Sequence, residues 1–215
     1  MSGESKRIIV FGATGGLGVP VLSAALDAGH RVTAFARNAS KVKLSHERLS
    51  VAVGDVLDAE AVASAVEGQD VVISALGPSP GAPAGTLIST GARNIISAMR
   101  RHEVKRLVFA SGLMVGSCGG MSAPKRLLIQ VFRLIHRALY LDKVVAEAVV
   151  RESGLAWIIV RPPVLAAVPR RGTYRVGRDL DVRLLDKFAF ADVADYMVRA
   201  TTEDEFIGSA VELSY

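Results

Sequence analysis

Hydrophobic residues along the chain fall into short continuous runs, which alternate with longer stretches where apolar residues recur at helical spacing. Strands that are apolar throughout are typical of a parallel sheet buried on both faces. The runs predict six strands, at residues 7–11, 31–36, 49–53, 71–75, 106–110 and 155–160. The helical stretches lie at about 17–28, 58–67, 85–101 and 123–153, and a further helix at 192–200 precedes a last strand at 209–213.

This alternation predicts an α/β fold, a Rossmann-type doubly wound, mostly parallel sheet with helices on both faces. We expect a single domain across residues 1–215, because patterned elements continue along the chain and no segment has the character of a linker. Three residues mark expected helix ends. Asp58 is a candidate N-cap, and Gly29 and Gly154 stand where helix C-caps belong.

Two irregular segments, residues 77–85 and 162–171, directly follow predicted strands. Ligands of open α/β sheets bind at the carboxyl ends of the strands. Because nearly all of the chain is used by the sheet and its helices, we expect the substrate pocket to be formed by loops at about 77–85, 111–122 and 162–180.

A glycine-rich segment, GATGGLG at residues 12–18, lies between the first predicted strand and the first predicted helix. Gly12 suits a tight turn, Gly15 suits close approach of the backbone to a pyrophosphate, and Gly18 suits packing of the helix on the strand. The free amides at a helix start attract an anion. An ordinary glycine-rich turn is the alternative, but this position in a βαβ unit favours a dinucleotide site.

The end of the second predicted strand indicates which dinucleotide binds. NAD-binding proteins place Asp or Glu there for the ribose 2′-hydroxyl, whereas this strand ends in Ala36, Arg37 and Asn38. The Arg37 guanidinium suits a 2′-phosphate, and Lys41 adds charge one turn further on. This favours NADPH, although a solvent-facing arginine at a strand end is the alternative.

Two further strand ends fit the same cofactor. Asp55 and Val56 follow the third strand and suit the adenine, while an alternative role for Asp55 is to cap the next helix. The fourth strand ends in Ser74, Ala75, Leu76 and Gly77. The small residues among them suit a ribose and a nicotinamide close to the backbone.

Composition narrows the class of protein. Hydrophobic residues make up 50% of the chain and mean hydropathy is +0.34, which excludes a disordered chain. The 26 Lys and Arg exceed the 21 Asp and Glu by 5, but no aromatic residues interleave with the charges, so we expect no nucleic-acid partner. A single cysteine, Cys118, excludes an intramolecular disulfide, and no metal-ligand spacing occurs. With no apolar run of about 18 residues, we expect no membrane partner and a cytoplasmic location.

Seven segments carry a family pattern that runs nearly end to end. They are GATGGLG at 12–18, ARNASK at 36–41, GDV at 54–56, SALG at 74–77, LVFASG at 107–112, DKVVAEAVVRESGLAWIIVRPP at 142–163 and ADVADYMV at 191–198. With these segments the chain resembles the atypical short-chain dehydrogenase/reductases, in particular the NAD(P)-binding NmrA-like group that includes biliverdin-IXβ/flavin reductases.

The resemblance implies a Rossmann fold, NADPH as cofactor and hydride transfer from the nicotinamide. It places residues of the glycine segment at the pyrophosphate, Arg37 at the 2′-phosphate, and Asp55 with Val56 at the adenine. The pyrophosphate residues are Gly12, Thr14, Gly15 and Leu17, and Gly16 in the same segment is a further candidate for cofactor binding.

The resemblance also assigns the reacting end of the site. Ser111 matches a serine beside the nicotinamide, and Lys143 matches the lysine that holds the nicotinamide ribose. Conventional members carry a tyrosine four residues before that lysine as proton donor, but position 139 is Leu139. Tyr140 lies one residue out of phase, about 100° further around a helix. Without a positioned acid, a conjugated acceptor is favoured, because solvent can protonate the delocalised anion that its reduction produces.

The sequence therefore predicts an NADPH-dependent reductase of a small conjugated acceptor, such as a flavin, a quinone, a tetrapyrrole or an aromatic polyketide. Arginines near residues 170–178 suit an anionic substrate. Two alternatives stay open: a protein that senses NADP(H) without turnover, and a carbonyl reductase or epimerase that uses Tyr140 with Lys143. The sequence leaves the oligomeric state open.

Overall fold

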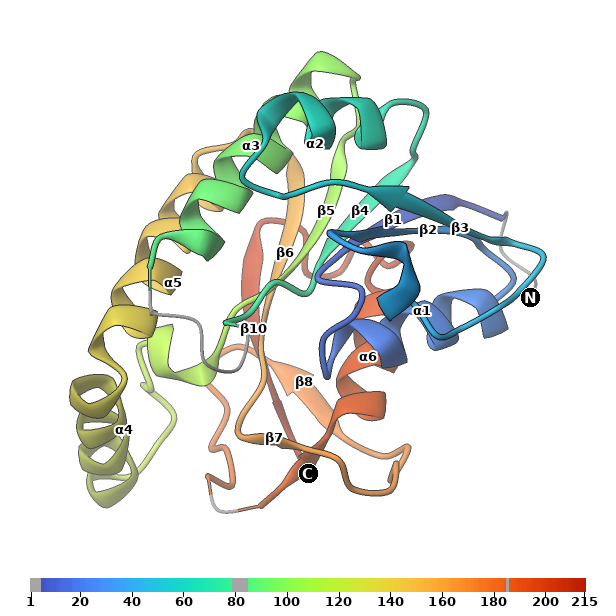
Figure 1. Cartoon of the computed structure of the whole chain (residues 1–215). Coiled ribbons are helices and arrows are strands. Elements are labelled where there is room, and N and C mark those ends of the chain that lie inside the picture. The colour runs from blue at the N-terminus through green and yellow to red at the C-terminus, as the bar shows by residue number, and fades with distance from the viewer. Residues whose placement is uncertain (1–4, 79–84, 185) are drawn as a thin grey trace.

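The computed structural model describes residues 5–78, 85–184 and 186–215. Among these residues, eight strands form one sheet in the order β3-β2-β1-β4-β5-β6-β10-β8 (Figure 1). The strands are β1 (Arg7–Phe11), β2 (Arg31–Ala36), β3 (Leu49–Val53), β4 (Val71–Ser74), β5 (Arg106–Ala110), β6 (Ala156–Arg161), β8 (Arg175–Gly177) and β10 (Ser209–Ser214). The pairs are parallel, except that β8 runs antiparallel to β10 at the edge.

Helices cover both faces of the sheet, as the sequence predicts (Figure 1). Alternate β1 side chains point to opposite faces, so that Ile8 packs with the α1 and α6 side while Ile9 packs with the α2, α3 and α5 side. The helices are α1 (Gly18–Asp27), α2 (Ala59–Val66), α3 (Leu87–Arg101), α4 (Ala123–Ile135), α5 (Arg137–Arg151) and α6 (Phe190–Arg199).

The predicted helix ends are confirmed where the structure shows the cap itself. The Asp58 carboxylate accepts hydrogen bonds from the amides of Glu60 and Ala61 at the start of α2. Gly29 follows the last residues of α1 with a φ of +89°, and Gly154 follows α5 with a φ of +70°. Both glycines adopt the left-handed conformation that ends many helices.

The single helix predicted over 123–153 is wrong. His136, with φ −106° and ψ 35°, separates α4 from α5. The break allows α4 to point in a different direction from α5. In this direction Arg133 on α4 donates hydrogen bonds to the carbonyls of Met114 and Gly116. Apolar periodicity alone did not reveal the break, since both helices are amphipathic and adjacent in sequence.

The sheet edges account for the other differences. The predicted strand at 49–53 is β3, but Val51 and Val53 are exposed because β3 is the edge strand of the sheet. Three short strands were not predicted, because two or three residues carry too little pattern. They are β8 and the separate pair β7 (Leu165–Ala166) and β9 (Phe188–Ala189).

Among the described residues, no helix combines the length and the apolar character needed to cross a bilayer.

Candidate active site

The glycine-rich segment lies where the strand order reverses, between the adjacent strands β1 and β4. Gly12 has a φ of +77°, and a Cβ on it would lie 2.5 Å from the carbonyl oxygen of Ala75 at the end of β4. A side chain at this position would therefore prevent the turn. Ligands of open α/β sheets bind at such a reversal point.

The remaining glycines of this segment shape a surface for an anion. Gly18 packs so closely against the Gly12 carbonyl that a Cβ would overlap it. Gly15 donates its amide to the same carbonyl at 3.0 Å, while Thr14, Gly15 and Gly16 are exposed. The N-cap of α1, Leu17, provides no side-chain cap, so the helix start can accept an external anion.

The end of β2 carries the predicted cationic residues. Arg37 is exposed immediately after the strand, and Lys41 is exposed in the short helical turn at Ala39–Lys41. Asn38 caps that turn, because its side-chain oxygen accepts a hydrogen bond from the Ser40 amide at 2.9 Å. The turn keeps the two cations within a few residues of the same strand end.

The end of β3 corrects one alternative. Asp58, not Asp55, caps α2, while Asp55 accepts the Leu57 amide at 2.9 Å in a local turn. Val56 is buried, and together with Leu76 it packs so closely on α3 that a Cβ on Gly91 would lie 3.0 Å from one and 2.8 Å from the other. The structure therefore brings together two residues predicted for different parts of the cofactor.

Two buried hydroxyls stand at the ends of the neighbouring strands β4 and β5. Ser74 is the last residue of β4, and Ser111 directly follows β5. Neither Oγ atom has a hydrogen-bond partner among the described residues. Leaving a buried polar group unpaired costs about 1–3 kcal/mol, so these two hydroxyls are available to a bound ligand or to an ordered water.

Lys143 reaches this same edge from α5. Its Nζ donates a hydrogen bond to the Ser111 carbonyl at 2.5 Å, and a Cβ on Gly112 would lie 3.1 Å from that nitrogen. Burial lowers the pKa of Lys143 to about 8, although Glu147 and Asp142 act in the opposite direction. The structure thus joins Ser111 and Lys143, which the family resemblance assigns to one site.

Tyr140 has a different environment. The Arg133 guanidinium lies over its ring, 5.2 Å from the centroid, and no hydrogen bond within the described part of the chain joins its hydroxyl to Ser111 or Lys143. Position 139 is occupied by a leucine that packs against the core beneath α3.

The comparison with protein families agrees with this geometry. Residues 12–204 match the sequence profile of a family described as NAD(P)H-binding. The chain belongs to the NAD(P)H-binding family.

Individual relatives of this NAD(P)H-binding protein cover most of its length. It is 29% identical over 221 residues to the uncharacterized chloroplastic protein At2g34460 of Arabidopsis thaliana, covering 98% of this chain and 77% of the relative. It is 26% identical to the reductase pytE of Aspergillus terreus, with both chains covered fully. The structure of ChuY, an anaerobillin reductase from Escherichia coli O157:H7, superposes with a TM-score of 0.79 at 22% identity over 97% of this chain and 96% of ChuY. This last likeness shows the shared fold.

Several residues that support the site were missed by the sequence reasoning. Asp142 is buried and accepts the amides of Ile88 and Ser89, each at 2.9 Å, so it caps α3 from the neighbouring helix α5. Glu147 binds Arg161 through two hydrogen bonds of 2.9 and 2.6 Å. Arg161 therefore braces α5 against β6. The only sequence signal was that these charges occur in otherwise apolar elements.

The predicted substrate loops are described in part. Residues 79–84 of the first lie outside the described residues. The second and third loops meet, because Ser117 donates a hydrogen bond to Asp179 at 2.8 Å. Cys118 is buried between them, and burial raises the pKa of its thiol, so it is not an activated nucleophile.

The arginines near 170–178 mostly serve the fold. Arg170 pairs with Asp195, Arg171 lies over the Tyr215 ring at 4.0 Å, and Arg175 contacts Ser214. Arg178 lines a polar cavity of about 240 Å³ beside β6 and β10. These contacts weaken the argument for an anionic substrate from this segment.

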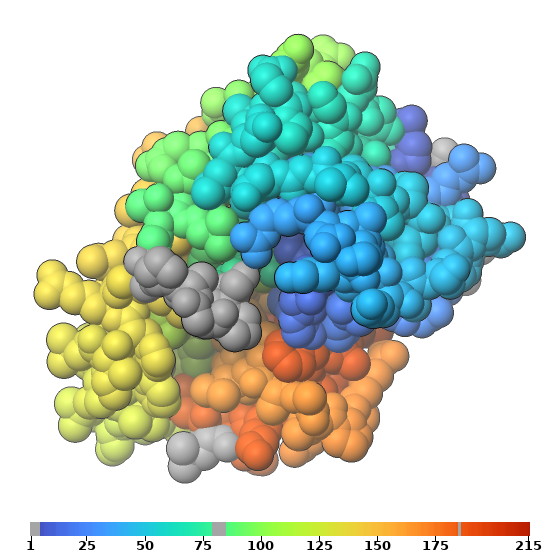
Figure 2. Space-filling model, viewed as in Figure 1, coloured from blue at the N-terminus to red at the C-terminus, as the bar shows by residue number. Residues whose placement is uncertain are grey.

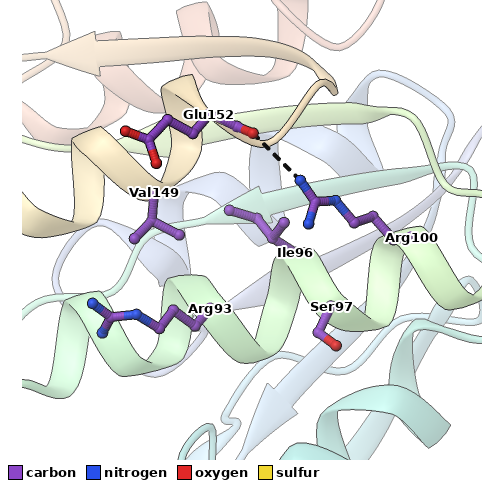
Figure 3. A pocket seen from close by; sticks show the side chains of 6 residues that line it. All are labelled: Arg93, Ile96, Ser97, Arg100, Val149 and Glu152. Carbon is purple, nitrogen blue, oxygen red and sulfur yellow. Dashed lines mark hydrogen bonds between the residues drawn. The ribbon is translucent and has the colours of Figure 1, made fainter.

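A larger groove, of about 350 Å³, lies between α3 and α5 (Figure 3). Its lining includes Arg100, which donates to the Glu152 carbonyl at 3.4 Å. Both residues stand at the helix ends that lead into the starts of β5 and β6. The groove therefore lies toward the amino-terminal ends of the strands, whereas the glycine-rich segment lies at their carboxyl ends.

Proposed function

We propose that this protein is an NADPH-dependent reductase that passes a hydride to a small conjugated acceptor, such as a flavin, a quinone, a tetrapyrrole or an aromatic polyketide. The observation that carries the proposal is the Ser111 hydroxyl, which is buried beside Lys143 at the end of β5 and has no hydrogen-bond partner within residues 5–78, 85–184 and 186–215. The reductase among the full-length relatives and the reductase with the same fold support this class of reaction.

The residues present fit a nicotinamide dinucleotide. The tight turn at Gly12 and the exposed backbone of Gly15 provide a cradle for a pyrophosphate at the start of α1. Further along the same edge, the orphan hydroxyls of Ser74 and Ser111 are available to hydrogen-bond the nicotinamide end. When bound, the reduced nicotinamide supplies the hydride.

The chain's own groups act by orientation and charge. Ser111 presents its hydroxyl to the nicotinamide end, and Lys143 presents an ammonium that is already held by the Ser111 carbonyl. The Arg133 guanidinium lies over the Tyr140 ring, and in the described part of the chain no hydrogen bond joins Tyr140 to Ser111 or Lys143, so we assign it no proton-donor role. A conjugated acceptor fits this arrangement, since its reduced anion is delocalised and accepts its proton from water.

The preference for NADPH rests on Arg37 and Lys41 at the end of β2. Titration of the protein with NADPH and NADH tests it, with Trp157 emission as the signal. We expect the protein to bind NADPH more tightly than NADH. We expect Arg37→Ala to weaken NADPH binding about tenfold while it leaves NADH binding nearly unchanged. Arg31→Ala, an exposed arginine at the opposite end of the same strand, is the matched control. Equal affinities of the wild type for the two cofactors would refute the assignment.

The acceptor class is tested with a panel of flavins, quinones, linear tetrapyrroles and simple ketones, each incubated with NADPH. We expect NADPH oxidation with a conjugated acceptor, a loss of about tenfold or more in Ser111→Ala, and near wild-type rates in Tyr140→Phe. Reduction of simple ketones that disappears in Tyr140→Phe would instead show a carbonyl reductase.

A further inference from the structure

The outward face of α4 is apolar and exposed. Leu127, Leu134 and Ile135 expose 67%, 74% and 68% of their surface, and Val131 and Phe132 are also exposed. On a helix these positions share one broad arc. Large apolar side chains gathered on one exposed face indicate a surface that meets another apolar body.

The opposite face of α4 holds the helix to the protein. Ile129 is the buried residue of α4, and Lys125 pairs with Asp181. Arg133 anchors the helix to the loop that follows Ser111 through the carbonyls of Met114 and Gly116. In the space-filling view, α4 lies at the left edge of the molecule (Figure 2). Its apolar face is therefore directed outward by fixed contacts.

The charges that α4 and its neighbouring residues in sequence carry are all positive, and the acidic residue that contacts α4, Asp181, is paired with Lys125. No acidic residue occurs between Glu103 and Asp142. Arg126 and Arg137 are exposed at either end of α4, and neither forms an ion pair with an acidic side chain of the described residues. An occupant of this face must therefore tolerate or neutralise positive charge.

We propose that α4 docks on the surface of a membrane that contains anionic lipids. Helices with an apolar face and cationic flanks lie in the interface, where acyl chains receive the apolar side chains and lipid phosphates neutralise the cations. A second copy of this chain fits less well, because a two-fold dimer through α4 would bring the same arginines together. Leu141 and Val145 on the following helix, α5, are also exposed apolar residues.

This docking differs from the expectation, drawn from composition, that the protein has no membrane partner. Long apolar runs reveal helices that cross a bilayer, whereas a helix that lies on its surface depends on which side chains the fold leaves exposed. The docking stands independently of the proposed reductase activity.

Co-sedimentation of the full chain with lipid vesicles tests the proposal. We expect the protein to sediment with vesicles of phosphatidylcholine mixed with phosphatidylglycerol, much less with phosphatidylcholine alone, and less as salt is added. Arg126→Gln with Arg137→Gln is expected to weaken binding about fivefold for each arginine. Leu134→Ser with Ile135→Ser is expected to abolish it.

Val53→Ser, at an exposed valine on the edge strand β3, is the control that keeps vesicle binding. All of these positions are exposed, so circular dichroism is expected to show folded variants. The proposal is overturned if the wild type does not sediment with the anionic vesicles, or if Leu134→Ser with Ile135→Ser binds them as the wild type does. It is also overturned if the wild type forms a dimer that this double variant dissociates while vesicle binding is absent.

Discussion

At the residue scale, the proposed function depends on Ser111 and Lys143. Ser111 directly follows β5 in the sequence. Lys143 belongs to α5, and its Nζ reaches the end of β5 by donating a hydrogen bond to the Ser111 carbonyl. Because Lys143 is removed from water, its ammonium is less favoured than that of an exposed lysine. The charge state of the site therefore changes close to neutral pH.

This shift predicts a pH dependence. The pKa of Lys143 is lowered to about 8, so the ammonium is present below that pH and is lost as pH rises through it. We expect kcat/KM for NADPH to fall above about pH 8, and Lys143→Met to lower it about 100-fold and remove the fall. Lys187→Met, at an exposed lysine, is the control, and we expect its kcat/KM to fall above about pH 8 as in the wild type. Persistence of the fall in Lys143→Met would assign it to another group.

The glycines allow a second residue-scale prediction. A Cβ on Gly15 meets only the Gly12 carbonyl, at 3.3 Å, so Gly15→Ala is expected to change the free energy of unfolding by less than about 1 kcal/mol. The same methyl would occupy the pyrophosphate cradle, so NADPH affinity is expected to fall about tenfold or more. Gly12→Ala is the comparison variant. Because Gly12 has a φ of +77°, an alanine there is strained, and we expect this variant to lower the free energy of unfolding. Denaturant unfolding measures the stability of each variant, and NADPH titration measures its affinity. Wild-type affinity for NADPH in Gly15→Ala would contradict the pyrophosphate site at the glycine-rich segment.

At the element scale, α5 organises one side of the site. Asp142 caps α3, Lys143 reaches Ser111, and Glu147 holds Arg161 on β6. The three charged residues extend from one helix to three other elements. Their partners are 14 to 54 residues away in sequence.

The buried cap predicts an asymmetry between two helices. Asp142→Ala leaves the amides of Ile88 and Ser89 unpaired in a buried position, so we expect a loss of about 2 kcal/mol in the free energy of unfolding. Asp58→Ala removes an equivalent cap that is exposed to water, and a loss of about 1 kcal/mol is expected. Urea denaturation compares the two, and an equal or smaller effect at Asp142 would refute its role.

These elements also show what local sequence can predict. The strands at 7–11, 31–36, 49–53 and 106–110 match the prediction to the residue, because short runs rich in apolar and β-branched residues mark them. The glycine-rich segment was recognisable because its geometry depends on its own residues. The break at His136 and the Asp142 cap depend on contacts made after folding, so neighbouring residues in sequence did not reveal them.

At the scale of the whole molecule, Asp192 ties α6 to Tyr215 and to the loop at Arg171 and Gly172. Its buried carboxylate accepts hydrogen bonds from the Tyr215 hydroxyl and from the amides of Arg171 and Gly172. Burial alone would raise its pKa, but these hydrogen bonds and Arg170 prevail and lower it. Asp192 thereby joins three segments that are distant in sequence.

This tie predicts an acid sensitivity. Because the pKa of Asp192 is lowered on folding, its contribution to stability is present above the unfolded pKa, near 3.9, and is lost as pH falls through the lower folded value. We expect the free energy of unfolding to fall more steeply below about pH 4 in the wild type than in Asp192→Asn. Tyr215→Phe is expected to cost about 1 kcal/mol at neutral pH. Parallel acid profiles for the wild type and Asp192→Asn would contradict this role.

The reductase assignment joins these scales, and the consumption of NADPH tests it most directly. In one sample, the affinity for NADPH is measured first, and the loss of nicotinamide absorbance is then followed after a flavin, a quinone or a linear tetrapyrrole is added. The NAD(P)H-binding family accounts for the binding step, and the proposed function predicts tight binding of NADPH followed by steady oxidation with at least one of these acceptors. Tight binding of NADPH with no oxidation by any of them would contradict the account and favour a sensor of NADP(H).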